Sequence, residues 1–208
     1  LLDTLKESPF RALVMTRGLI SLGLEEEGIY LLAAEACNEL VKEGQNYSEL
    51  ALAFLEKEDP SWGVSYHQGY HFFHLERYAE ALEAWKRLLE QDAPEEIQTE
   101  VLTRIPLAER RQDFLRGKEL LFKERFEEAR QVFKSLLPDF PHWYELHFYY
   151  GLSLRFLEEY KEALSTFYSL LQHHREDIHL YNELAICHLF VGEAAEAKIL
   201  LEEGLRIA

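Results

Sequence analysis

Three histidines are the residues whose type and spacing could most directly support chemistry. His67, His71 and His74 follow one another at intervals of four and three residues. On a helix these intervals place the side chains on one face, so three imidazoles could offer nitrogen ligands to a zinc ion. A structural zinc site needs four ligands, and the sequence nominates no fourth. The surrounding tyrosines and phenylalanines favour a different role, in which the histidines belong to the wall of an amphipathic helix.

Other catalytic patterns are missing from the sequence. There is no glycine-rich phosphate loop, no Gly-x-Ser-x-Gly, no Cys-x-x-Cys and no His-Glu-x-x-His. Acidic pairs such as Glu158-Glu159 fall at predicted turns and helix starts, where they complement the helix dipole. The sequence therefore predicts that the protein is not an enzyme and uses no metal and no cofactor.

Composition restricts the class of partner. The chain has 22 basic and 38 acidic residues and a net charge of −16, which repels nucleic acids and anionic membrane surfaces. No run of 18 apolar residues suggests a membrane span. Cys37 and Cys187 are far apart and predict buried thiols in a reducing compartment, hence a cytoplasmic protein.

A repeat of 34 residues organises the second half of the chain. Gly117, Gly151 and Ala185 lie 34 residues apart, and Gly69 marks an earlier copy. Each small residue is followed twelve residues later by an alanine, and four residues after that by a large apolar residue. These pairs are Ala81 and Trp85, Ala129 and Phe133, Ala163 and Phe167, and Ala197 and Leu201. A unit of two helices cannot bury its apolar faces alone, so the spacing predicts an all-α stack of helical hairpins.

The copy around Gly151 shows the expected hairpin in detail. A first helix ends near Leu157, residues 158–160 form a turn, and a second helix begins at Lys161. This segment resembles a tetratricopeptide repeat, as do residues 68–92, 116–141 and 184–208. The resemblance covers about 62–208 and implies a right-handed superhelical solenoid of antiparallel helix hairpins, with four repeats in 61–208.

Two regions depart from the repeat. Gly69 and Gly117 are 48 residues apart, which leaves 14 extra residues. We expect a helical insertion near 93–106, with a short helix over 95–104 that Pro106 ends. Residues 1–60 predict helices over 9–22, 29–41 and 47–57, with Gly23 and Gly44 as stops. This region is either an N-terminal cap, built from degenerate repeats, or a specialised partner site.

The resemblance also implies a binding surface. In tetratricopeptide arrays the first helix of each hairpin lines the concave face, at fixed offsets from the small residue. Applied to this chain, the offsets select mainly apolar side chains, about half of which we expect to be core. The candidate peptide-binding residues are Tyr66, Tyr70, Phe73, Phe114, Lys118, Phe122, Phe148, Leu152, Phe156, Asn182, Ile186 and Phe190.

These positions predict a non-catalytic scaffold or adaptor, chaperone-like in character, that holds an apolar peptide or helix of a protein partner. Relatives that clamp acidic chaperone tails use lysine, asparagine and arginine at the inward positions. Here Tyr66, Tyr70, Phe114, Phe148 and Leu152 occupy such positions and Lys118 is the one basic match, so a carboxylate clamp is not expected. Two alternatives remain open. The chain could be the accessory region of a larger enzyme such as a glycosyltransferase, or a regulator whose N-terminal helices move when a peptide binds. Self-association also stays open, because a second copy can cover an apolar groove or a terminal hairpin.

Overall fold

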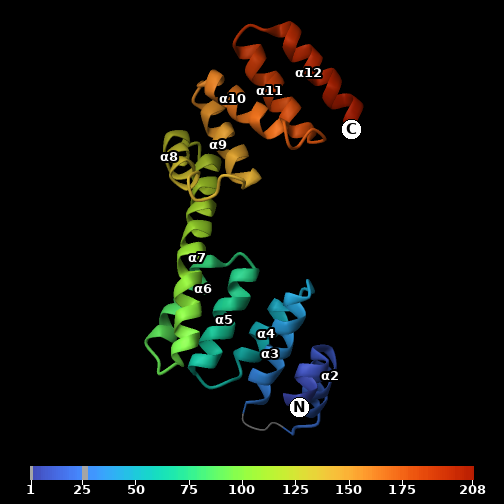
Figure 1. The fold of residues 1–208 in the computed structure, drawn as a ribbon, viewed down its shortest axis with the longest axis vertical. Helices are drawn as coiled ribbons and strands as arrows, with labels where there is room; N and C mark the ends of the chain where they lie inside the picture. The colour runs from blue at the N-terminus through green and yellow to red at the C-terminus, as the bar shows by residue number, and fades with distance from the viewer. Residues whose placement is uncertain (1, 25–27) are drawn as a thin grey trace. The chain divides into compact units, whose positions relative to one another are not determined.

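The computed structural model describes residues 2–24 and 28–208, and over this part of the chain it contains twelve α-helices and no strand (Figure 1). The predicted all-α class is therefore confirmed. The helices are α1 (Leu2–Glu7), α2 (Pro9–Ser21), α3 (Ile29–Lys42), α4 (Ser48–Leu55), α5 (Trp62–His74), α6 (Tyr78–Leu89), α7 (Glu95–Phe122), α8 (Phe126–Leu136), α9 (Tyr144–Phe156), α10 (Tyr160–Leu171), α11 (Ile178–Phe190) and α12 (Ala194–Ile207).

The chain forms two compact units. Unit 1 is Leu1–Gln112 and unit 2 is Asp113–Ala208, so α7 contributes to both. Within each unit, helices that follow one another in sequence pack together as hairpins: α3 with α4, α5 with α6, α9 with α10, and α11 with α12. Hairpins are the elements that the 34-residue spacing predicts.

Each repeat glycine lies against the ring that follows it by sixteen residues. Gly69 faces Trp85, Gly117 faces Phe133, and Gly151 faces Phe167. A Cβ atom on Gly151 would lie 2.6 Å from Cε1 of Phe167, whose ring is fully buried. The two helices of the hairpin can approach this closely only because the first one has no side chain at that point. In the last copy Ala185 replaces the glycine, and Leu201, the residue sixteen positions later, is 41% exposed.

The turn inside each hairpin has one repeated geometry. Glu76, Glu124, Glu158 and Gly192 all have positive φ, between 59° and 86°. The next residue then donates its backbone N–H to a carbonyl five residues earlier, as from Glu159 to Leu154 at 2.9 Å. This pairing satisfies carbonyls that the end of the first helix would otherwise leave free, and it reverses the chain for the second helix.

The predicted helices of the N-terminal region are present as α2, α3 and α4. Gly23 and Gly44 follow α2 and α3 with positive φ, as expected of helix stops. The Ser8 hydroxyl caps α2 by accepting the Arg11 N–H at 3.4 Å. Helix α1 was not predicted, because a segment of six residues contains too few apolar positions to show a period.

The predicted short helix over 95–104 is wrong. Helix α7 continues through Pro106 to Phe122, so the extra residues lengthen the first helix of the next hairpin. Proline removes one backbone hydrogen bond and strains the preceding turn. Val101 and Ala108, on either side of it and seven residues apart, are both fully buried in the same core as Trp85. Packing on both sides therefore keeps the helix continuous.

Both cysteines have buried side chains and free thiols, as predicted. Burial raises the pKa of Cys37 to about 12 and that of Cys187 to about 11. None of the helices in residues 2–24 and 28–208 has the length and apolar character needed to span a bilayer.

Candidate functional site

The predicted binding residues lie on α5, α7, α9 and α11, the first helices of their hairpins. Side chains from the last three of these helices, together with one from α8, enclose a cleft in unit 2 of about 450 Å³. Four predicted residues line it: Phe122, Phe148, Leu152 and Phe156. The remaining lining residues are Leu121, Glu124, Phe126, Tyr149, Arg155 and Glu183.

The wall of this unit 2 cleft is aromatic. Phe126, the first residue of α8, stacks on Phe156, the last residue of α9, with ring centroids 4.7 Å apart and planes 6° from parallel. Phe122 at the end of α7 is 75% exposed, and Phe156 is 42% exposed. Large apolar side chains with this exposure have surface left to bury against a ligand.

One ion pair interrupts the apolar wall. Arg155 Nε lies 2.7 Å from Glu183 Oε2, with the two side chains only 17% and 13% exposed. The Arg155 guanidinium also lies over the ring of Phe156, 4.1 Å from its centroid. Burial raises the pKa of Glu183, and the neighbouring Arg155 charge acts against this shift. The cleft thus offers one charged, largely desolvated pair beside several aromatic surfaces.

Other predicted residues of unit 2 lie outside the cleft. Phe114 is buried against Trp143, with ring centroids 4.3 Å apart, and so belongs to the core. Lys118 extends over Tyr149, its Nζ 5.1 Å from the ring centroid. Asn182 and Phe190 are exposed and Ile186 is half-buried, all on α11. Phe190 stacks on Tyr160 with ring centroids 5.1 Å apart. This contact is equivalent to the Phe126–Phe156 contact, one 34-residue repeat later in the chain.

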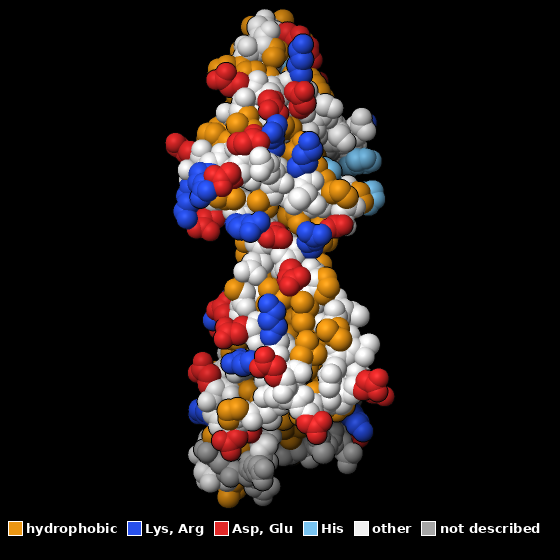
Figure 2. Space-filling view, turned by 90° about the vertical axis from the view of Figure 1, so that its left-hand side faces the viewer, with side chains coloured by type: hydrophobic (Ala, Val, Ile, Leu, Met, Phe, Trp, Pro, Cys, Tyr) orange, Lys and Arg blue, Asp and Glu red, His pale blue; other side chains and the backbone are white. Residues whose placement is uncertain are grey.

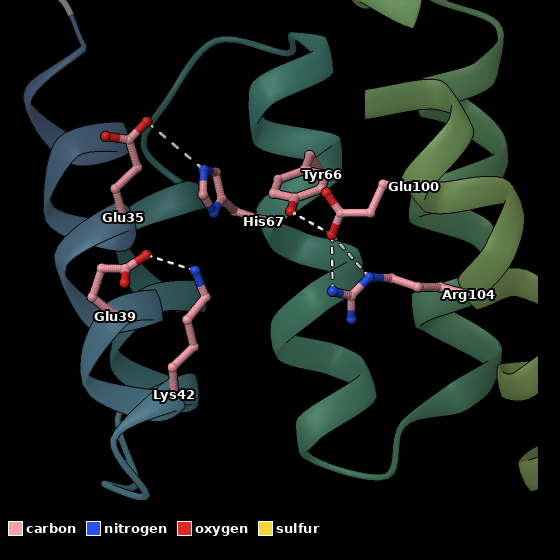
Figure 3. Close-up of polar contacts among 7 residues, drawn as sticks. All are labelled: Glu35, Glu39, Lys42, Tyr66, His67, Glu100 and Arg104. Carbon is pink, nitrogen blue, oxygen red and sulfur yellow. Dashed lines mark hydrogen bonds and ion pairs between the residues drawn. The ribbon is translucent and has the colours of Figure 1, made fainter. Parts of the chain in front are cut away.

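Unit 1 presents a different face, formed by α3, α5 and the first part of α7 (Figure 3). The Tyr66 hydroxyl donates to Glu100 Oε1 at 3.0 Å, and Arg104 Nη2 donates to the same oxygen at 2.8 Å. Burial, and then the hydrogen bond to the Glu100 carboxylate, raise the pKa of Tyr66 to about 12. On α3, Lys42 pairs with Glu39 at 2.7 Å. Salt bridges and a bonded hydroxyl make this face polar.

The remaining predicted residues of α5 are mostly covered. Tyr70 is buried, and the Arg104 guanidinium lies 5.6 Å from its ring centroid. Phe73 is half-buried and contacts Trp85 and Tyr78, with centroids 5.9 Å and 5.3 Å away. The apolar stripe expected on α5 is thus partly core and partly covered by charged side chains.

The three histidines of α5 have separate surroundings. His71 is fully buried and its Nδ1 lies 3.3 Å from the Ser48 hydroxyl. His67 Nε2 lies 3.8 Å from Glu35 (Figure 3), and His74 is exposed beside the Tyr70 ring. Burial lowers the pKa of His71 to about 3. Across the described residues no three His, Cys, Asp or Glu side chains are grouped so that they could hold a metal ion.

A second cleft in unit 2 was missed by the sequence analysis. It has a volume of about 440 Å³ and is lined by His142, His147, His173, His174 and Tyr144, among others. Figure 2 shows histidine side chains gathered on the surface. Helix α9 and the segments after α8 and α10 bring them together, and no spacing in the sequence connects these segments.

Comparison with known families defines the class. A sequence model of the tetratricopeptide repeat family matches residues 48–96 and 114–178, together more than half of the chain. The chain therefore belongs to the tetratricopeptide repeat family. Among curated proteins, none is a significant match to this sequence.

Several solved structures are similar. MamA from residue 41 onward, of Desulfovibrio magneticus RS-1, is 14% identical, with 84% of this chain and 94% of that chain covered and a TM-score of 0.49. A MamA RS-1 ArsTM double mutant is 15% identical, with 82% and 89% covered and a TM-score of 0.48. YrrB, described as a TPR protein with an unusual peptide-binding site, is 18% identical, with 92% and 91% covered and a TM-score of 0.47. Likeness of this degree says nothing about a ligand of the present chain.

Proposed function

We propose that this member of the tetratricopeptide repeat family is a non-catalytic adaptor that holds an apolar segment of a protein partner in the unit 2 cleft. The family provides protein-interaction scaffolds in general. The specific ligand class is inferred from the cleft itself, since a fold alone does not supply a function.

The exposure of Phe122 and Phe156 at the cleft carries the proposal. Both side chains lie beside the buried Leu121 and the half-buried Leu152, so a ligand would meet a continuous apolar surface. A phenylalanine or leucine side chain inserted among these rings would bury apolar area worth about 25 cal/mol per Å². Aromatic residues in desolvated pockets dominate the binding energy of such interfaces.

The Arg155–Glu183 pair would fix the orientation of a bound peptide. Its donors and acceptors lie beside the apolar wall, where a peptide backbone could hydrogen-bond to them. Partners of this kind are short helices or extended segments with one or two large apolar anchors. The net charge of −16 favours protein over nucleic acid as the partner.

The proposal can be tested with a random peptide library displayed on phage, followed by fluorescence anisotropy with the enriched peptides. We expect enriched peptides to share aromatic or leucine anchors. Replacing Phe122 with Glu should weaken their binding at least about tenfold, because a charge would then be desolvated in the cleft. The helical circular dichroism signal should stay unchanged, since Phe122 is 75% exposed.

Leu102 supplies the matched control, because it is 55% exposed on the part of α7 that lies in unit 1. Leu102→Glu should bind the same peptides as the wild type. Equal binding by Phe122→Glu and wild type, or enrichment of peptides without apolar anchors, would show that the cleft is not the binding site.

The N-terminal region is proposed to act as a cap. Helices α2, α3 and α4 share one apolar core with Val64 of α5, which supports a capping role. The buried thiols of Cys37 and Cys187 are compatible with a cytoplasmic protein.

A further inference from the structure

The second cleft of unit 2 has a wall rich in histidine. It has a volume of about 440 Å³, and four of the nine histidines of the chain line it. We call it the histidine cleft. Its lining residues are Pro141, His142, Tyr144, His147, Ser169, Leu170, His173 and His174. None of these residues lines the unit 2 cleft, so the two clefts are separate features and an inference about one does not depend on the other.

Packed elements hold the four imidazoles of the histidine cleft near one another. His142 precedes α9, His147 belongs to α9, and His173 and His174 follow α10. Helices α9 and α10 form one hairpin, and the His174 ring meets the Tyr144 ring edge to face with centroids 4.6 Å apart. The histidine wall is therefore built by the hairpin itself.

One imidazole of this wall lacks a partner. The Nε2 atom of His147 is buried and has no hydrogen-bond partner among the described residues. A buried polar atom without a partner destabilises the folded state unless a water molecule or a ligand supplies the missing hydrogen bond. Because His147 lines the histidine cleft, its free nitrogen indicates that the cleft has an occupant with a polar group.

The charges around the histidine cleft favour an anion. None of the described residues that line it is a carboxylate, although acidic residues outnumber basic ones 38 to 22 in the chain. The unit 2 cleft, by contrast, includes Glu124 and Glu183. Other charged or titratable side chains belong to the segments beside the histidine cleft but do not line it: Asp139, Glu145, Arg175, Glu176, Asp177 and His179.

Tyr144 and Asp177 add no free negative charge to this wall. The Tyr144 hydroxyl donates a hydrogen bond to Asp177 Oδ2. Burial, and then this hydrogen bond, raise the pKa of Tyr144, so its hydroxyl stays neutral. The other carboxylate oxygen of Asp177 accepts the His179 backbone N–H at 2.9 Å, which holds the carboxylate at the start of α11. An anion in the cleft would thus meet lining groups that are neutral or, in the case of protonated imidazoles, positive.

The spread of the donors favours a polyatomic anion over a metal ion. No three metal-ligating side chains of the described residues are grouped closely enough to hold one ion. A phosphate monoester carries three strong acceptor oxygens and so can reach several donors at once. Each neutral imidazole donates one N–H and each protonated imidazole two, and the Ser169 hydroxyl is a further donor. Pro141 and Leu170 supply apolar surface for the group that carries the phosphate.

We propose that the histidine cleft binds a phosphate monoester carried on an apolar or aromatic group. The net charge of −16 disfavours nucleic acids, which extend along a protein surface. A single phosphate group depends mainly on the lining of the cleft, because charges farther away than about 8 Å are largely screened at physiological ionic strength. Histidine changes its charge between about pH 5 and 8, so binding should strengthen as the pH falls within this range.

The test uses phenyl phosphate as the probe and follows binding by calorimetry and by the nitrogen chemical shifts of the imidazoles in NMR spectra. The wild type should bind phenyl phosphate, and the affinity should fall at least about fivefold between about pH 6.5 and pH 8 in about 0.15 M salt. The Nε2 signal of His147 should shift on binding. Phenylacetate should bind more weakly, because a carboxylate has fewer acceptor oxygens than a phosphate.

Two variants locate the site. His142 and His173 are exposed, so the double variant with His142→Gln and His173→Gln should keep the helical circular dichroism signal of the wild type. It should bind phenyl phosphate at least about fivefold more weakly and with less dependence on pH, because two of the four imidazoles are missing. His179→Gln is the matched control: His179 is an exposed histidine of α11 that does not line the cleft, and its loss should leave binding unchanged.

A phosphotyrosine peptide distinguishes two sources of the ligand. Tighter binding of the peptide than of phenyl phosphate would assign the phosphate to a protein partner, whereas equal binding would assign it to a small molecule. The proposal would be overturned if phenyl phosphate failed to bind at about pH 6.5, or if phenylacetate bound equally well. Equal weakening by His179→Gln and by the double variant would also overturn it, and so would binding of zinc without binding of phenyl phosphate.

Discussion

Replacing Gly151 with alanine tests the contact that sets the distance between the two helices of a repeat. The added Cβ would lie 2.6 Å and 2.8 Å from two ring carbons of Phe167. That ring is fully buried, so it cannot move away into solvent. The helices must separate or the ring must leave its preferred position.

Two opposing effects set the magnitude. Alanine in a helix interior is favoured over glycine by about 0.5–1 kcal/mol. Overpacking in a closed core costs about 1–3 kcal/mol. We therefore expect Gly151→Ala to lower the free energy of unfolding by the difference between the two effects, which is about 1 kcal/mol and at most about 2.5 kcal/mol.

Gly18 supplies the control, because it is a helical glycine of α2 and an added methyl group there would have no neighbouring atom within 4 Å. Gly18→Ala should raise stability by about 0.5–1 kcal/mol, since only the helix propensity changes. Urea unfolding followed by circular dichroism gives both values. A double variant with Phe167→Leu should recover part of the loss at Gly151, because the smaller side chain makes room. Equal stabilisation by Gly151→Ala and Gly18→Ala would show that the contact between Gly151 and Phe167 does not limit the size of residue 151.

Three further predictions concern the turns, a buried histidine and the ion pair. Glu158 has a φ of 62°, so Glu158→Gly should raise the free energy of unfolding measured with urea, and Gly192→Ala should lower it, by about 1 kcal/mol each. Burial lowers the pKa of His71 from 6.5 to about 3. Between these two pH values His71 is protonated in the unfolded chain and neutral in the folded protein, so protons favour the unfolded state. Stability should therefore fall as the pH drops through this window, and His71→Gln should reduce the fall in urea midpoints measured against pH. Arg155→Met leaves the Glu183 carboxylate buried without its partner and should cost about 3 kcal/mol in urea unfolding, whereas adding Glu183→Leu should restore most of the loss.

The repeat architecture could be predicted because one period carries all of its parts. The residue that must be small, Gly151, and the ring that it faces, Phe167, recur together at a fixed separation. A contact between two helices therefore shows up in the sequence as two residue types at a fixed spacing, and this spacing predicts the hairpins. The continuous helix α7 could not be predicted in this way. Pro106 is a local signal for a break, and it is overridden by the burial of Val101 and Ala108 in the core.

The candidate site was only partly within reach of the sequence. The inward offsets find Phe122 and Phe156, but they omit Tyr149 and Glu183, which lie two residues before their repeat's small residue. They also omit Phe126, because it begins a second helix.

Equivalent positions also differ in burial. Phe114, Phe148 and Asn182 share one offset but are buried, half-buried and exposed, respectively. The repeat register predicts the position of a residue on its helix, whereas the burial of its side chain depends on the size of the neighbouring side chains.

The close packing of Trp85 under Gly69 gives the molecule a built-in optical probe. Trp85 is fully buried in unit 1, whereas Trp143 is the sole tryptophan of unit 2. In a variant with Trp62 replaced by Phe, each unit would carry one indole, and replacing either remaining tryptophan would make the fluorescence report on the other unit alone. Denaturation followed by emission wavelength would then show whether the halves joined by α7 melt together or in succession.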